Sequence, residues 1–210
     1  MQVEVNPEWS QRLKALADRI AAVEVRIKQA EQISGRVVYP AVGELRYLGR
    51  NLARILGDLT GGDINPEAFE THLRDAELCC TRANNDVIDA VFSHVSIELD
   101  FLRQSYGAPL LNMHLADYVE ILTIIRDGQE KIAMSRRRVG DGRDRVYADL
   151  GDDFLDKLIE YHSKIQLNTE ILEEAYADIT KAKKRYSFHA GLNVVFAIAA
   201  LLLTIGAALL

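Results

Sequence analysis

One stretch of the chain gathers charged and amide side chains at spacings that suit a binding pocket. Arg82, Asn85, Asp86 and Asp89 fall within two turns of a predicted helix, and His94 follows on the apolar face of the same helix. Residues three or four positions apart share one helical face, so these side chains lie close together. The pattern predicts either a buried ligand-binding pocket or a network of ion pairs and hydrogen bonds that fixes helix packing. The preceding helix would supply a facing cation from Arg46, Arg50 or Arg54.

The histidines and cysteines lack the spacing of common metal sites. Di-iron sites of helical bundles need Glu and His three residues apart on one helix, and none of the five histidines has Glu three residues before it. The two cysteines, Cys79 and Cys80, are adjacent, so they are too few for a thiolate zinc site and too close to form a useful disulfide. The sequence therefore predicts no metal, no other cofactor and two reduced thiols.

Motifs of nucleotide-binding and hydrolytic enzymes are also missing from the sequence. The chain has no Gly-Lys pair of a phosphate-binding loop, no Gly-x-Ser-x-Gly turn and no Ser-x-x-Lys pair. It resembles the helical ribonucleases of the HEPN type in being an all-α bundle, but it lacks their Arg followed after four to six residues by His. We therefore expect no enzyme activity and no catalytic residue, and a helical-bundle enzyme is a third hypothesis only.

The final 21 residues, from Ala190 to Leu210, carry no charged side chain. As a helix with a rise of about 1.5 Å per residue they would span roughly 31 Å, close to the ~30 Å hydrocarbon core of a bilayer. Basic residues flank such spans on the cytoplasmic side and attract anionic lipid headgroups. The pattern predicts a tail-anchored, single-pass membrane protein whose N-terminal domain is cytoplasmic. The basic flank consists of Lys181, Lys183, Lys184 and Arg185.

The charge of the rest of the chain limits its partners. The net charge is −6, and because the four flanking cations contribute +4, residues 1–180 carry −10. Nucleic-acid binding needs basic surface to displace phosphate counterions, so nucleic acid is not an expected partner. The first ten residues include Glu4, Pro7 and Glu8 and form no apolar segment, so no secretory signal peptide is expected.

Apolar residues recur at spacings of three and four along almost the whole chain, which is typical of amphipathic helices. Two helix starts are marked by Asn-Pro-Glu, at 6–8 and 65–67, where Asn caps the helix and Pro enters its first turn. Glycine and proline then divide the chain into about five long helices. Their expected ranges are 7–34, 40–59, 66–106, 110–138 and 153 onward, with the most loop-like segment at 136–145. The predicted fold class is all-α, an up-and-down bundle in residues 1–185.

The last predicted helix joins this bundle to the anchor. Its apolar residues repeat alternately at three and four positions, as in helix bundles and coiled coils. No proline interrupts the chain from there onward, so the helix is expected to continue into a single transmembrane helix. That helix forms a second predicted domain, 186–210. The repeating seam comprises Leu158, Ile165, Leu172, Ile179 and Tyr186.

Two functions of different classes fit this organisation. Within the anchor, Ala200, Thr204 and Ala208 form a face of small residues, which lets transmembrane helices approach closely. The chain would then be a homo-oligomer that senses or assembles through its bundle and acts on the membrane. In its build it resembles the small membrane-perturbing effectors of bacterial defence systems. The alternative is a membrane-tethered adaptor or scaffold whose bundle binds a protein partner, and in both cases the lipid bilayer is a partner.

Overall fold

The computed structural model describes residues 6–61, 64–137 and 141–208, with the side chains of residues 6–61, 64–137, 142–151 and 154–185. These residues form seven α-helices, one π-helical segment and no strand, so the predicted all-α class is confirmed. The helices are α1 (Pro7–Ser34), α2 (Tyr39–Gly61), α3 (Pro66–Tyr106), α4 (Ala108–His114), α5 (Tyr118–Ser135), α6 (Asp141–Leu150) and α7 (Asp156–Ala208), and the π-helical segment is η1 (Gly151–Leu155).

The first three helices begin and end close to the predicted residues because their boundaries are set by local chemistry. The side chain of Asn6 accepts a hydrogen bond from the backbone N–H of Glu8 at 2.9 Å, and Asn65 caps α3 in the same way. Gly35 ends α1 with a φ of 62°, in the left-handed region that glycine adopts without strain. Each of these signals acts within a few residues, so the sequence alone displays it.

Two later boundaries differ from the sequence prediction, and tertiary packing accounts for the first. The predicted helix 110–138 is divided into α4 and α5 at Leu115, whose backbone is extended. Both Leu115 and Tyr118 are buried at this turn, so breaking the helix places two apolar side chains in the core. The expected loop at 136–145 is also shorter than predicted, because the helix resumes at Asp141 and continues through α6 and η1 into α7.

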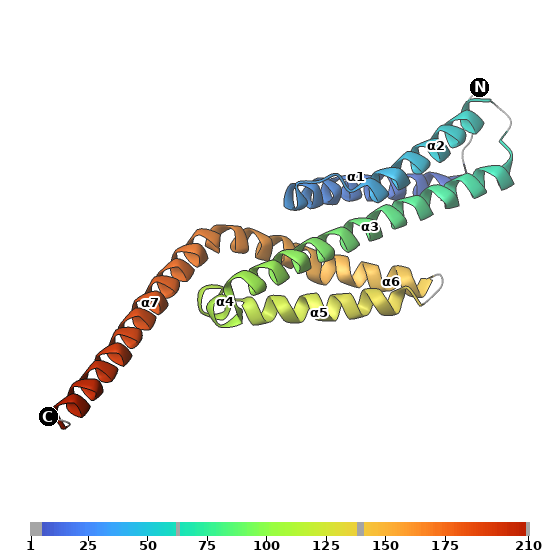
Figure 1. The fold of residues 1–210 in the computed structure, drawn as a ribbon. Coiled ribbons are helices and arrows are strands. Elements are labelled where there is room, and N and C mark those ends of the chain that lie inside the picture. The colour runs from blue at the N-terminus through green and yellow to red at the C-terminus, as the bar shows by residue number, and fades with distance from the viewer. Residues whose placement is uncertain (1–5, 62–63, 138–140, 209–210) are drawn as a thin grey trace.

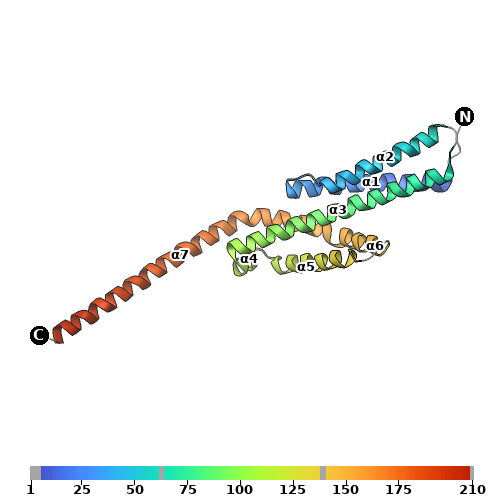
Figure 2. The same cartoon turned by 45° about the vertical axis from the view of Figure 1, so that its right-hand side comes forward.

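Helix α3 is the axis of the molecule (Figures 1 and 2). Both views show α1 and α2 beside its N-terminal part, and α4, α5 and the α6–α7 run beside its C-terminal part. Successive long helices run in alternating directions, so α7 runs in the same direction as α3 (Figure 1). This alignment brings together residues of α3 and α7 that are far apart in the sequence, such as Glu98 and Gln166.

Helix α1 is held on α3 by one ring contact and one ion-pair cluster. The Trp9 ring stacks on Phe69 with the ring centroids 4.2 Å apart. The Arg12 guanidinium contacts the carboxylates of Glu70 at 2.6 Å and Glu77 at 2.8 Å. These contacts fix the register of α1 against the start of α3.

The N-terminal part of α3 carries small buried residues that let its neighbours lie close to it. Ala76, Cys80 and Ala83 have no exposed surface. Cys79 is also buried, and both thiols are free. Burial, assisted by the nearby Glu44 carboxylate, raises the pKa of Cys79 to about 11, and burial also raises the pKa of Cys80. Both thiols are therefore protonated packing groups at neutral pH.

The buried face of α3 changes along the helix. Phe69, Leu73 and Val87 are buried, but Ile97 and Phe101, whose spacing would continue the same apolar stripe, are 67% and 65% exposed. The partners of α3 change along its length from α1 and α2 to α5 and α7, which cover a different face. The buried residues of this second face are Ile88, Val91, Phe92, Val95, Leu99 and Leu102.

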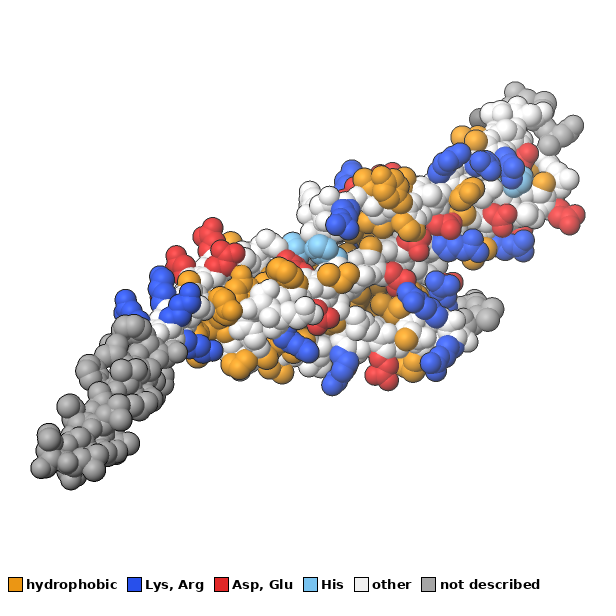
Figure 3. Space-filling model, viewed as in Figure 1, with side chains coloured by type: hydrophobic (Ala, Val, Ile, Leu, Met, Phe, Trp, Pro, Cys, Tyr) orange, Lys and Arg blue, Asp and Glu red, His pale blue; other side chains and the backbone are white. Residues whose placement is uncertain are grey.

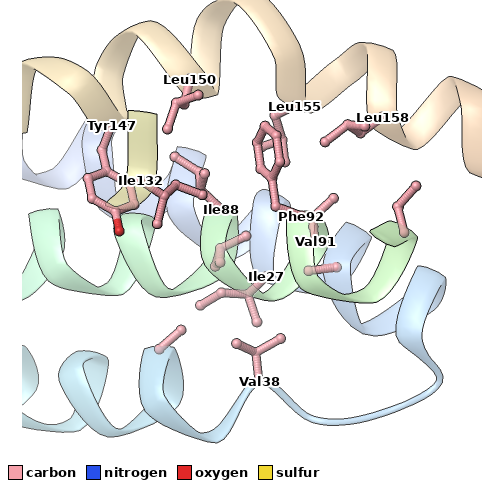
Figure 4. Close-up of a cluster of buried hydrophobic side chains, with 14 of the residues drawn as sticks. Ile27, Val38, Ile88, Val91, Phe92, Ile132, Tyr147, Leu150, Leu155 and Leu158 are labelled. Atoms are coloured by element: carbon pink, nitrogen blue, oxygen red, sulfur yellow. The ribbon is translucent and has the colours of Figure 1, made fainter. Parts of the chain in front are cut away.

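The two groups of helices share one core at the middle of α3 (Figure 4). In Figure 4, Ile27 and Val38 approach α3 from the side of α1 and α2, and Leu150 and Leu155 approach it from the opposite side. Phe92 of α3 lies between these groups and is almost completely buried. The bundle is therefore one packed unit, with the polar side chains described below set along its central helix.

Helix α7 begins in this core and then leaves it. Leu158, Ile165 and Leu172 of the predicted seam have no exposed surface, whereas Ile179 is exposed. Figures 1 and 2 show the C-terminal part of α7 extending away from the other helices. Within the residues that the structure describes, no helix combines the length and the apolar composition needed to cross a membrane. The side chains of 186–210, including Tyr186, lie outside the described residues, so the transmembrane helix stays a prediction.

Candidate functional site

The structure connects part of the predicted polar cluster through hydrogen bonds. Asp89, half-buried on α3, accepts a hydrogen bond from the hydroxyl of Tyr147 on α6 at 2.8 Å and another from Nη2 of Arg136 at 3.4 Å. Tyr147 has no exposed surface, and burial and the Asp89 carboxylate raise its pKa, so the hydroxyl is a proton donor at neutral pH. Asp89 therefore joins α3 to α6 and to the end of α5.

Asp86, one turn before Asp89, is half-buried among charges of both signs. Burial raises the pKa of Asp86, and the carboxylates of Glu44 and Asp89 act in the same direction, whereas Arg143 and Arg82 lower it. Glu44 is the α2 group in this set, so α2 presents a carboxylate here where the sequence suggested one of its three arginines. Arg82 itself is exposed, so it is not an internal member of the predicted network.

Asn85 is buried and faces a different part of the molecule. It lines a cavity of about 360 Å³ between α1, α3 and α6, together with Asn84 and Asp144. Arg26 of α1 donates a hydrogen bond to Oδ1 of Asn84 at 2.8 Å. The predicted cluster is thus divided, because Asn85 lines this cavity whereas Asp86 and Asp89 line a hollow beside His94.

His94 belongs to a second cluster, which the sequence analysis missed. Its ring centroid lies 5.6 Å from that of His162 on α7. Nε2 of His162 lies 3.4 Å from Oε2 of Glu98, and Gln166 donates a hydrogen bond from Nε2 to Oε1 of Glu98 at 2.5 Å. Burial lowers the pKa of His162 and raises that of Glu98. One ligand atom each from His94, Glu98 and His162 lie within 4.8 Å of one another, so this group is able to hold a metal ion.

A surface hollow connects the two clusters. Its volume is about 520 Å³, and its walls include Asp89 and Arg136 of the first cluster and His94 of the second. Arg36, between α1 and α2, and Pro40, at the start of α2, also line it. The histidine cluster is therefore reached from solvent on the His94 side.

A sequence signal for the second cluster exists, although it is weak. His94 and Glu98 are four residues apart, as are His162 and Gln166, so each pair shares one helical face. A search for Glu three residues before His excludes both pairs. Recognising the site also requires knowing that α3 and α7 are parallel neighbours, which the sequence does not show.

A third feature lies where α7 leaves the bundle. An apolar hollow of about 270 Å³ lies between the α3–α4 turn and α7 and is lined by both. The rings of Tyr106 and Tyr176 meet edge to face there, with centroids 5.5 Å apart, and Met113 is 76% exposed. Figure 3 shows hydrophobic side chains at this end of the bundle, beside basic side chains and next to the grey C-terminal segment.

The predicted basic flank adjoins this apolar hollow. All four of its cations are exposed, and Lys183 lines the hollow. Lys181 lies 3.5 Å from Asp178, one turn earlier on α7. The flank thus presents four exposed cations from one short segment of α7: Lys181, Lys183, Lys184 and Arg185. The side chains of the predicted transmembrane packing face lie outside the described residues: Ala200, Thr204 and Ala208.

Comparison of the chain with protein-family models, with curated proteins and with solved structures finds no match. The polar clusters on α3, the apolar end of the bundle and the course of α7 are the features that bear on function.

Proposed function

We propose that this protein is a membrane effector whose acidic helical bundle is held at the cytoplasmic face of a bilayer and acts on it through residues 186–210. The observation that carries this proposal is α7, an uninterrupted helix from Asp156 to Ala208 that begins in the core and extends beyond the bundle (Figures 1 and 2). The uncharged run 190–210 overlaps the end of α7 and, as a continuous helix, would have roughly the length of a bilayer core. A helix shared between core and membrane would carry a change in bundle packing to the bilayer.

The apolar end of the bundle supports a position at the membrane surface. Met113, Tyr176 and Ile179 are exposed there, next to the cations of the flank. Tyrosine and long basic side chains suit the headgroup region because each joins an apolar body to a polar end. Anionic lipid contributes about 1 kcal/mol for each cation near the surface. The α3–α4 turn would then rest on the headgroups while α7 enters the bilayer beside it.

Self-association would occur within the membrane. Leu158, Ile165 and Leu172 are buried inside one chain, so this part of the seam is not available to a second copy. The small-residue face predicted at Ala200 and Ala208 remains, and such faces support modest helix–helix association in bilayers. An effector that opens a path for ions needs several copies, because one apolar helix cannot line an aqueous path.

A membrane-tethered adaptor is the second candidate, and the surface of α2 favours it. Tyr39, Tyr47 and Leu56 are exposed on α2, at 77% for Tyr39. Figure 1 shows α2 running from the middle of the molecule to the end opposite the C-terminus. Exposed tyrosines are frequent in protein interfaces, so a cytoplasmic partner is expected to bind α2 if the anchor only localises the bundle.

The first experiment tests the membrane location. The full-length chain and a version that ends at Arg185 are expressed separately, and membranes are washed with alkaline carbonate. We expect the full-length chain in the pellet and the shorter version in the supernatant. Full-length protein in the wash would contradict both candidate functions, since each requires the anchor.

The second experiment separates effector from adaptor. Ala200→Leu with Ala208→Leu fills the small-residue face, and Ala199→Leu with Gly206→Leu places two leucines on the opposite face as a control. The effector proposal expects the first pair to reduce cross-linked oligomers and membrane depolarisation, and the control pair to retain both. Full depolarisation by a chain whose 192–210 segment is replaced with polyleucine would refute the effector proposal. The adaptor expects partner binding without depolarisation in all of these variants.

A further inference from the structure

We propose that His94, Glu98 and His162 bind a zinc ion between α3 and α7. The inference is independent of the membrane function, and it runs against the sequence-based expectation of no metal. Two imidazoles and one carboxylate form a recurrent protein ligand set for zinc, with water or another ligand in the fourth position. The site would be made by two helices that are adjacent only in the folded chain.

The distances fit a tetrahedral metal. Zinc bonds of about 2.0–2.1 Å to nitrogen and oxygen place two tetrahedral ligands about 3.4 Å apart. The distance between Nε2 of His162 and Oε2 of Glu98 is 3.4 Å. The ligand atoms of all three residues lie within 4.8 Å of one another, so the His94 ring has to move closer to the other two ligands for all three to bind one ion.

The hydrogen bonding of the Glu98 carboxylate also favours a metal, and this observation is independent of the distances. Oε2 of Glu98 is buried and has no hydrogen-bond partner among the described residues, although His162 lies close to it. Oε1 of the same carboxylate is held by the Gln166 amide, which turns Oε2 toward the two histidines. A buried carboxylate oxygen without a hydrogen bond is costly, and a cation would remove that cost. Gln166 would act as an outer partner that orients the ligand, as is usual around metal ions.

The chemistry of the donor set selects the class of metal. Ca²⁺ and Mg²⁺ prefer oxygen donors and high coordination numbers, which two imidazoles do not provide. Imidazole nitrogen suits zinc and other first-row transition metals. The fourth position would be open toward the hollow on the His94 side, so a water molecule or a small anion from solvent would complete the coordination.

The test uses the untagged full-length chain, purified in mild detergent and stripped with EDTA, which is then removed. Zinc titration is expected to show one saturable site, and Co²⁺ is expected to give the visible absorption of a tetrahedral site. His94→Gln and His162→Gln should each weaken binding by more than the 10–100-fold typical of losing an outer partner. His114→Gln, a histidine at the end of α4, and Cys79→Ser with Cys80→Ser are matched controls that should bind zinc normally.

A measurement on the unmodified protein guards against variants that misfold. X-ray absorption of the zinc-loaded wild-type chain should show nitrogen and oxygen neighbours at about 2.0–2.1 Å with the scattering pattern of two imidazoles. Sulfur in the first coordination shell, or fewer than two imidazoles, would overturn the proposal. So would the absence of saturable zinc binding, or unchanged affinity in a folded His94→Gln, His162→Gln double variant.

Discussion

Gly128 of α5 is expected to be the position where adding one methyl group does the most damage. A Cβ built there would overlap Cε1 of Phe92 and would lie 2.6 Å from Cζ and 2.9 Å from Cδ1 of the same ring. Phe92 is 1% exposed, so its ring cannot swing into solvent to make room. Gly128→Ala therefore has to move α5 away from α3 or push Phe92 into its neighbours.

The size of the effect follows from two opposing contributions. Alanine favours a helix over glycine by about 1 kcal/mol. Overpacking a core by one methyl group costs about 1–3 kcal/mol, and the overlap with a confined ring puts Gly128→Ala at the upper end. The net loss of unfolding free energy is then about 2 kcal/mol. With a urea dependence of about 2 kcal/mol per molar, the unfolding midpoint should fall by about 1 M.

The assay is urea unfolding of the full-length chain in mild detergent, followed by circular dichroism. Gly49→Ala is the matched control, because a Cβ at Gly49 meets nothing within 4 Å and the residue is exposed on α2. That substitution should raise the midpoint by up to about 0.5 M, since only the helix propensity changes. In a Phe92→Leu background, Gly128→Ala should cost much less than in the wild type, because the ring is gone. A Gly128→Ala midpoint equal to or above that of the wild type would refute the argument.

Three further predictions concern the polar clusters. Tyr147→Phe removes the hydrogen bond to Asp89 and should lower the unfolding free energy by about 1–2 kcal/mol in the same urea assay; no change would mean that water replaces the hydroxyl. The folded-state pKa of Asp86 is raised, so its ionised form destabilises the fold at neutral pH. Asp86→Asn should therefore raise the melting temperature at pH 7, and the gain should shrink toward pH 4, where the unfolded carboxyl also becomes protonated; a gain that is constant with pH would contradict this. Zinc at 100 times its dissociation constant stabilises the folded protein by about 2.7 kcal/mol. Amide hydrogen exchange should therefore slow in 156–172 of α7 and around His94, but not in α2. Uniform slowing would argue for global stabilisation and against a local site.

The parts of the fold that the sequence reveals are those set by near neighbours. Asn6, Asn65 and Gly35 fix helix ends through contacts within a few residues, so the first three helices are visible in the sequence. The break at Leu115 is not visible in this way, because it is stabilised by burial of Leu115 and Tyr118 against distant helices. Apolar periodicity shows that a helix has a buried face, but it does not show that the face changes when the neighbours change.

The same distinction applies to the candidate site. The proximity of Asp86 and Asp89 follows from their spacing on one helix, and the sequence predicts it. Their partners come from other helices: Tyr147 is 58 positions from Asp89. The histidine cluster depends on the register between α3 and α7, where Gln166 meets Glu98 across 68 positions. Side-chain spacing therefore identified His94 as a candidate without identifying the residues that give it a chemical role.

The position of the histidine cluster on α7 links the two proposals. Ala190, where the uncharged run begins, lies 28 residues after His162, or about 42 Å further along α7. A metal at His162 would fix the start of this helix to α3, and insertion of its far end would fix its direction relative to the membrane. If α7 moves as one body, zinc binding and membrane insertion restrict the same motion. Their coupling must then be reciprocal. A bilayer that favours one position of α7 changes the zinc affinity by the same factor by which bound zinc changes the preference for that position. A metal site elsewhere in the bundle, on α1 or α2, would have no such route, because neither helix continues toward the C-terminal segment (Figure 2).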